Sequence, residues 1–146
     1  MSELARSLAD HHNCKVAVVS GRRSYITGAI LPKSEDWEGI SISRLAYRDW
    51  NLRGVTKRSA CNLIFTAKVA LKLLFGPKYD VVLVTTAPPF LPIAASILRF
   101  FRRTPYAYMI YDLEPERSCR LGVIDCQKLP AKLLKIAQRA WLRKGC

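Results

Sequence analysis

Residues 80–102 read DVVLVTTAPPFLPIAASILRFFR, and this stretch decides the fold. Its β-branched opening predicts a strand over residues 80–86, and such a continuous apolar run is typical of parallel strands buried on both faces. Pro88 and Pro89 then predict a turn. A helix is expected from about residue 90 to 102, because Pro92 is tolerated in a first helical turn.

The same stretch is long enough to raise the question of a membrane span. Residues 81–98 contain no charged side chain, and an uncharged apolar run of this length is typical of a transmembrane helix. Three prolines interrupt the run, however, and proline inside a helix breaks or kinks it. Strand, turn and helix are therefore favoured over a span.

Strands and helices continue to alternate on both sides of this stretch. The periodicity predicts helices and strands over the following ranges: helix 2–10, strand 15–20, a strand through Ile40, Ile42 and Arg44, helix 53–75 ending at Gly76-Pro77, strand 106–111 and helix 129–143. This order predicts one α/β domain over residues 1–146, a three-layer Rossmann-like fold with a parallel sheet. Because the chain opens within a helix and closes on one, we expect a fragment that lacks the first strand of that sheet.

The charge of the chain is strongly positive. Its 146 residues include 24 Lys and Arg against 11 Asp and Glu, a formal net charge of +13. Such an excess attracts an anionic partner, which can be a nucleic acid, a membrane surface or a phosphorylated small molecule. The five cysteines are odd in number and scattered, which favours reduced thiols buried as small hydrophobes over disulfides. No cluster has the spacing of a zinc site, so no metal is expected.

The basic residues are concentrated on two predicted helices. In the first of these, Lys57, Lys68 and Lys72 fall on one face, with Leu63, Leu71 and Leu74 among the apolar positions. In the last helix a stripe with helical spacing is formed by Lys128, Lys132, Lys135, Arg139 and Arg143. A solvated face explains such a stripe, but an unbalanced Lys/Arg stripe beside apolar residues favours contact with anionic lipid headgroups.

Three loops follow predicted strands, where ligands gather in parallel α/β sheets. They cover residues 20–28, 85–89 and 112–116; the first carries Arg22 and Arg23, and the third is acidic. Loop 85–89 is interpreted as structural. Asp112, directly after a predicted strand, is placed either to orient a hydroxyl or accept its proton, or to cap the next helix.

Read in order, three segments resemble the amino-terminal domain of family 4 glycosyltransferases, which have the GT-B fold and retain anomeric configuration, and especially the bacterial polysaccharide-assembly subgroup. Residues 3–30 are similar to that family's helix, strand and loop, with Tyr25, Thr27 and Gly28 at matching positions. The run KYDVVLVTTAPPF, residues 78–90, looks like the family's strand and Pro-Pro turn, and residues 106–124 resemble its strand ending in D-L-x-P-E, which includes Asp112 and Glu116.

The resemblance implies the acceptor-binding half of such an enzyme, which moves a sugar from a nucleotide-sugar donor to a lipid-linked or saccharide acceptor without a metal. Asp112 would act on the acceptor hydroxyl, Tyr25, Thr27, Gly28 and Glu116 would contact the acceptor, and Arg22 and Arg23 would pair with its phosphate. The family's Gly-Gly loop and E-x7-E motif have no counterpart here, so we expect no turnover by this chain alone. The implied location is the cytoplasm, peripheral to the inner face of the cell membrane.

Two other functions are kept as alternatives. A basic nucleic-acid-binding module would suit the charge, but aromatic residues are not interleaved with the basic ones as such modules require. A non-catalytic scaffold that pairs with a separately encoded donor domain is also compatible with the sequence.

Overall fold

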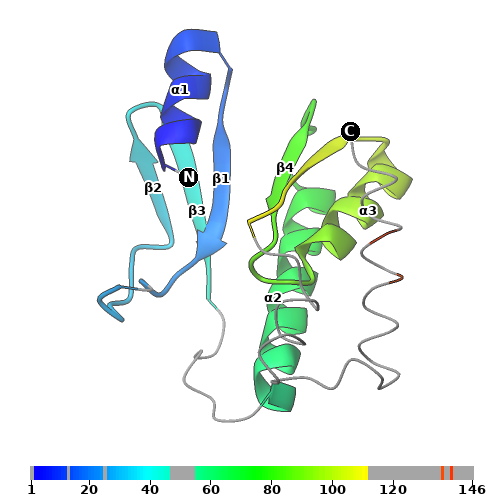
Figure 1. The fold of residues 1–146 in the computed structure, drawn as a ribbon. Helices are drawn as coiled ribbons and strands as arrows, with labels where there is room; N and C mark the ends of the chain where they lie inside the picture. Colours follow the sequence, from blue (N-terminus) through cyan, green and yellow to red (C-terminus); the bar gives the residue numbers. More distant parts are fainter. Residues whose placement is uncertain are drawn as a thin grey trace. The chain divides into compact units, whose positions relative to one another are not determined.

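The computed structural model describes residues 2–12, 14–24, 26–46 and 55–111, together with Ile136 and Arg139. The chain divides into two compact units, Met1–Cys61 and Asn62–Cys146. Both contain helices and small sheets with parallel strand pairs (Figure 1), which confirms the α/β class.

The first unit is a three-stranded sheet with one helix. Helix α1 (Ser2–His12) is followed by β1 (Ala17–Gly21), β2 (Ser34–Trp37) and β3 (Ile40–Leu45), and the strand order is β1-β3-β2. Strands β1 and β3 pair in parallel, with Ala17 opposite Ser41 and Gly21 opposite Leu45. The predicted strands at 15–20 and around Ile42 are therefore confirmed, and the carboxyl ends of both lie at one edge of the sheet.

Strand β2 was not expected, and it makes this sheet mixed rather than parallel. It pairs antiparallel with β3 through a two-residue turn at Glu38 and Gly39, whose φ angles are 52° and 80°. Two positive φ angles in succession are typical of a type I′ hairpin turn. Asp36 Oδ1 accepts a hydrogen bond from the Gly39 N–H at 3.1 Å and closes the turn. Residues 34–37, SEDW, have little strand propensity. They form a strand because the turn brings them alongside β3.

The second unit contains residues 80–102, the strand–turn–helix stretch. Strand β4 (Val82–Thr85), helix α3 (Leu91–Arg102) and strand β5 (Tyr106–Met109) form a β-α-β unit in which the two strands are parallel. The strand, turn and helix predicted for residues 80–102 are confirmed. Among the residues that the structure describes, no helix is long and apolar enough to cross a membrane.

The small core of this unit lies where α3 packs on the two strands. Val84, Ala95 and Tyr106 are buried together, with Val82 and Tyr108 packed against them. The expectation that the strand predicted over residues 80–86, here β4, is buried on both faces was wrong. Val82 and Val84 face α3, whereas Leu83, which alternates to the other face, is 39% exposed.

Helix α2 (Val55–Phe75) buries a stripe that contains both apolar and polar side chains. Its fully buried positions recur at helical spacing: Cys61, Asn62, Phe65, Thr66, Val69, Ala70 and Leu73. Leu63 and Leu71, two of the apolar positions of this helix, are 52% and 54% exposed. The core stripe includes polar residues, so hydrophobicity alone does not locate it.

The prediction of buried thiols was correct for one of the two described cysteines. Cys61 is buried in α2, whereas Cys14 is exposed after α1, where its thiol donates to the His12 carbonyl oxygen at 3.6 Å. Cys119, Cys126 and Cys146 lie outside the described residues.

Candidate functional site

The loop after β1 folds back on itself as a short, hydrogen-bonded hairpin over residues 22–31. The Leu31 N–H donates to the Arg22 carbonyl at 2.8 Å, and the Ser24 N–H donates to the Ala29 carbonyl at 2.9 Å. The tip closes where the Gly28 N–H donates to the Ser24 carbonyl at 3.0 Å, with Gly28 at a φ of 70°. The described residues of the loop that carries most of the predicted acceptor residues therefore form a hydrogen-bonded hairpin.

Two hydroxyl groups stabilise the tip of this hairpin. Ser24 Oγ accepts from the Thr27 N–H at 3.2 Å, and Thr27 Oγ1 accepts from the Ala29 N–H at 3.3 Å. An accepting hydroxyl keeps its own hydrogen for donation. Thr27 thus both shapes the turn and presents an O–H donor.

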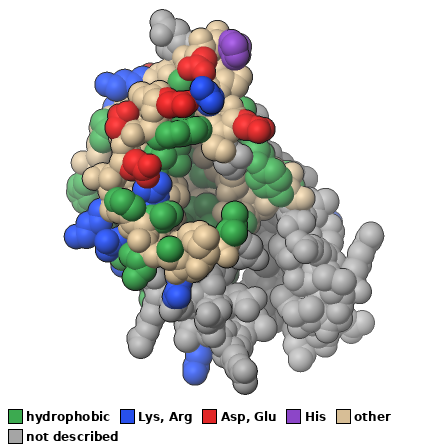
Figure 2. Space-filling model, turned by 90° about the vertical axis from the view of Figure 1, so that its left-hand side faces the viewer, with side chains coloured by type: hydrophobic (Ala, Val, Ile, Leu, Met, Phe, Trp, Pro, Cys, Tyr) green, Lys and Arg blue, Asp and Glu red, His purple; other side chains and the backbone are tan. Residues whose placement is uncertain are grey.

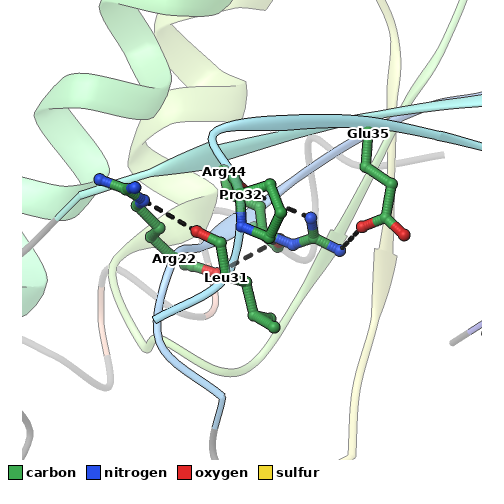
Figure 3. A network of polar contacts seen from close by, with 7 residues as sticks. Arg22, Leu31, Pro32, Glu35 and Arg44 are labelled. Atoms are coloured by element: carbon green, nitrogen blue, oxygen red, sulfur yellow. Dashed lines mark hydrogen bonds and ion pairs between the residues drawn. The ribbon is translucent and has the colours of Figure 1, made fainter. Parts of the chain in front are cut away.

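The Nε atoms of the two predicted arginines donate hydrogen bonds to carbonyl groups of the same hairpin. Arg22 Nε donates to the Leu31 carbonyl at 2.8 Å (Figure 3), and Arg23 Nε donates to the Gly28 carbonyl at 2.9 Å. Because a guanidinium is planar, fixing its Nε fixes the direction of its terminal nitrogens. The base of the hairpin is joined to the sheet where the Arg22 N–H donates to the Leu45 carbonyl at 3.0 Å, at the carboxyl end of β3.

A third arginine, Arg44, belongs to the same group of polar contacts and was not among the predicted site residues. Arg44 on β3 lies 2.5 Å from Glu35 on β2, and its Nη1 lies 3.5 Å from the Pro32 carbonyl oxygen (Figure 3). The β2–β3 register places Glu35 opposite Ile42, so Arg44 is its diagonal neighbour on the same face. The sequence could not indicate this pair, because it depends on the unexpected strand β2.

The hairpin also presents apolar side chains. Ile26 at the tip is 93% exposed, and Ile30, bridged to Arg23 across the hairpin, is 73% exposed. A ligand that contacts this surface meets cationic and apolar groups together, as a phosphate attached to a hydrocarbon chain would require. The signal in the sequence was the isoleucine within GRRSYITG and the one that follows it.

The face of the molecule in Figure 2 carries acidic and basic side chains near one another. Ion pairs occur in the first unit: Arg6 lies 3.5 Å from Asp10 and 3.1 Å from Glu38, in addition to the Arg44–Glu35 pair. Most of these side chains are about half exposed, so each pair contributes little to stability.

The carboxyl edge of β4 and β5 is tied together by backbone and hydroxyl groups. Thr86 Oγ1 accepts from the Tyr111 N–H at 3.2 Å, and Thr85 Oγ1 donates to the Ala87 carbonyl at 3.0 Å. The threonine hydroxyls of loop 85–89 thus serve the fold. Tyr111 is the last residue of the described segment 55–111, and Asp112, which follows it in the sequence, lies outside the described residues.

The structure brings together four of the predicted site residues, namely Arg22, Arg23, Thr27 and Gly28, on one hairpin. Arg139 is helical and exposed. The other predicted site residues lie outside the described residues: Tyr25, Asp112, Glu116, Lys128, Lys132, Lys135 and Arg143.

In the described part of the chain, no group of three or more His, Cys, Asp or Glu side chains could hold a metal ion. Comparison with known proteins adds no assignment: no family model, no curated protein and no solved structure matches this chain.

Proposed function

We propose that this chain is the acceptor-binding part of a retaining glycosyltransferase with a Rossmann-like three-layer fold. It would bind a lipid-linked or saccharide acceptor, while a nucleotide-sugar donor would bind a separate donor domain. The single observation that carries the proposal is the hairpin at residues 22–31. It follows a parallel strand at the sheet edge where ligands bind in α/β folds, and it holds two arginines in fixed orientation.

The hairpin is suited to an acceptor with a phosphate group. A guanidinium fixed through its Nε needs little further ordering to pair with phosphate oxygens, so less conformational entropy is lost on binding. Thr27 would donate its O–H to a sugar oxygen, and Ile26 would contact an apolar portion of the acceptor. Asp112 would orient or deprotonate the attacking hydroxyl, and Tyr25, Gly28 and Glu116 would complete the acceptor site.

The parent enzyme would work at the inner face of the cell membrane, where lipid-linked acceptors lie. The stripe from Lys128 to Arg143 would contact anionic headgroups there, each cation near the surface contributing about 1 kcal/mol. The donor half is required for transfer, so the isolated chain is expected to be inactive. Sugar transfer or donor hydrolysis by the purified chain that disappears in Asp112→Asn would contradict this part of the proposal.

Acceptor binding is tested by calorimetric titration with a saccharide pyrophosphate that carries a short prenyl chain, compared with the same saccharide without phosphate. We expect the phosphorylated compound to bind more tightly, and the Arg22→Gln/Arg23→Gln variant to lose about tenfold or more in affinity, since bonds to charged groups contribute about 1.5–3 kcal/mol each. Lys15→Gln, an exposed cation of the same unit, is the control and should bind normally. Equal affinity for both compounds would refute the proposal, and tighter, salt-dependent binding of RNA would favour a nucleic-acid-binding module instead.

A further inference from the structure

Three phenylalanine side chains are exposed at the carboxyl ends of α2 and α3. Phe75, the last residue of α2, is 85% exposed, and Phe100 and Phe101 in the last turn of α3 are 80% and 69% exposed. We call these three residues the aromatic end. Single exposed apolar residues are ordinary, but three exposed aromatic rings at paired helix ends indicate a contact surface.

The two helix ends are fixed to each other by Arg102. Its Nη1 lies 2.8 Å from the carbonyl oxygens of Leu73 and Gly76, which flank Phe75 on either side. The rings of Phe100 and Phe101 pack edge to face, with their centroids 5.1 Å apart. The aromatic end is therefore held on two helices that are joined directly at their termini.

The aromatic end is not part of the core stripes of these helices. In α2 the buried stripe passes through Phe65, Val69 and Leu73, and in α3 it passes through Ala94, Ala95 and Leu98. Both helices thus pack through other residues, and the three phenylalanines remain exposed.

Among the described residues of the second unit, the charge is predominantly positive. Residues 62–111 contain a single acid, Asp80, against six basic residues: Lys68, Lys72, Lys78, Arg99, Arg102 and Arg103. Lys78, Arg99 and Arg103 are exposed and lie within a few residues of the phenylalanines along the chain. A second copy of this chain would bring the same positive charge and be repelled. An anionic lipid surface satisfies the cations and the rings at once.

We propose that the aromatic end is a membrane-docking site that inserts its phenylalanine rings into the interface of an anionic bilayer. This site uses other residues than the Lys/Arg stripe of residues 128–143. It rests on the proposed function in one respect: it would give the acceptor-binding part a defined contact with the membrane. Vesicles without any saccharide lipid suffice to test it, so its failure would leave acceptor binding untouched.

The test is co-sedimentation of the full chain with vesicles of phosphatidylglycerol and phosphatidylcholine, and with vesicles of phosphatidylcholine alone. The mixed vesicles should bind the chain more tightly, and Phe100→Ser/Phe101→Ser should lower binding to them about tenfold or more, since burying a phenylalanine is worth about 1.5–3 kcal/mol. Leu63→Ser/Ile64→Ser is the matched control. It removes two exposed apolar side chains from the same unit, roughly 16 Å along α2 from Phe75, and should bind normally.

Two further variants separate insertion from folding defects and from charge alone. Phe100→Leu/Phe101→Leu keeps apolar side chains and should retain most of the binding, whereas Arg103→Gln should weaken it about fivefold on anionic vesicles only. Unchanged binding in the double serine variant, or an equal loss in the Leu63/Ile64 control, would overturn the proposal. A lipid-free dimer that the serine variant abolishes would overturn it in favour of a second copy of the chain.

Discussion

The contact between Arg102 and the end of α2 gives the sharpest prediction for stability. Arg102 Nη1 lies 2.8 Å from the carbonyl oxygens of Leu73 and Gly76, and 3.1 Å from that of Pro77. These groups lie at or beyond the carboxyl terminus of α2, where helix carbonyls lack partners within the helix. Replacing Arg102 by methionine keeps the apolar stem and removes the donors.

The cost follows from the number of hydrogens on that nitrogen. One Nη carries two, so it forms two full hydrogen bonds at a time, and the third carbonyl shares one of them. Bonds to a charged group contribute about 1.5–3 kcal/mol each, and the lower value applies because the contacts are only partly buried. We expect Arg102→Met to lower the free energy of unfolding by about 3 kcal/mol, and Arg102→Lys by roughly half as much, because an ammonium group can bond to some of the same carbonyls.

The assay is urea unfolding followed by circular dichroism, supported by thermal melting. A loss of about 3 kcal/mol should lower the melting temperature by roughly 6–12 °C in a chain of this size, with an unchanged dependence on urea concentration. Arg103→Met, at the exposed arginine directly after Arg102, is the control and should cost less than about 1 kcal/mol. If Arg102→Met costs no more than Arg103→Met, the bonds between the helix ends do not stabilise the unit as reasoned.

Two further predictions concern particular backbone and side-chain groups. Gly39→Ala should lower the free energy of unfolding by about 1 kcal/mol because of the left-handed backbone alone, since no heavy atom lies within 4 Å of the added Cβ. In Gly76→Ala the added Cβ would lie 2.6 Å from the Lys72 carbonyl oxygen. This substitution should therefore lower the free energy of unfolding by at least about 2 kcal/mol. Urea unfolding measures both, and equal costs would contradict this reading of the two sites. Burial, with a smaller contribution from Tyr106, raises the pKa of Tyr108 above 10.0. The neutral form is therefore favoured in the folded state, and the stability that it contributes is complete below about pH 10 and lost as the pH rises through the raised pKa. Tyr108→Phe should lose less stability between about pH 9 and pH 11 than the unmodified chain, and an identical loss would refute the assignment.

Elements with strong local signals could be predicted from the sequence. Helix α3 begins one residue from its expected start and ends at Arg102 as expected, because Pro92 and the apolar spacing determine it locally. Strands β4 and β5 were placed by their β-branched and aromatic runs. What the sequence could not give was strand β2, since a type I′ turn with Glu38 at a positive φ has no strong signal in residue type.

The candidate site was predictable in its residues but not in its geometry. Arg22 and Arg23 stand out in the sequence as adjacent cations directly after a predicted strand. Their hydrogen-bond partners cannot be read from the sequence. Their Nε bonds to the carbonyls of Leu31 and Gly28 depend on the chain reversal across the hairpin. Burial has the same limit: Leu63 and Asn62 are adjacent in α2, yet the polar residue is buried and the apolar one is exposed.

The distribution of charge separates the two proposed contacts in a way that salt can reveal. The first unit, Met1–Cys61, contains ten basic and six acidic side chains in its sequence, a net charge of +4, whereas the second, Asn62–Cys146, contains fourteen and five, a net charge of +9. Phosphate binding at the hairpin therefore depends on two arginines at contact distance, in the less charged of the two units. Docking at the aromatic end depends on several exposed cations acting over distances near the Debye length, about 8 Å at physiological ionic strength. Added salt should consequently weaken vesicle binding steeply and binding of the phosphorylated acceptor only modestly. Two contacts with one common electrostatic origin would instead weaken in parallel.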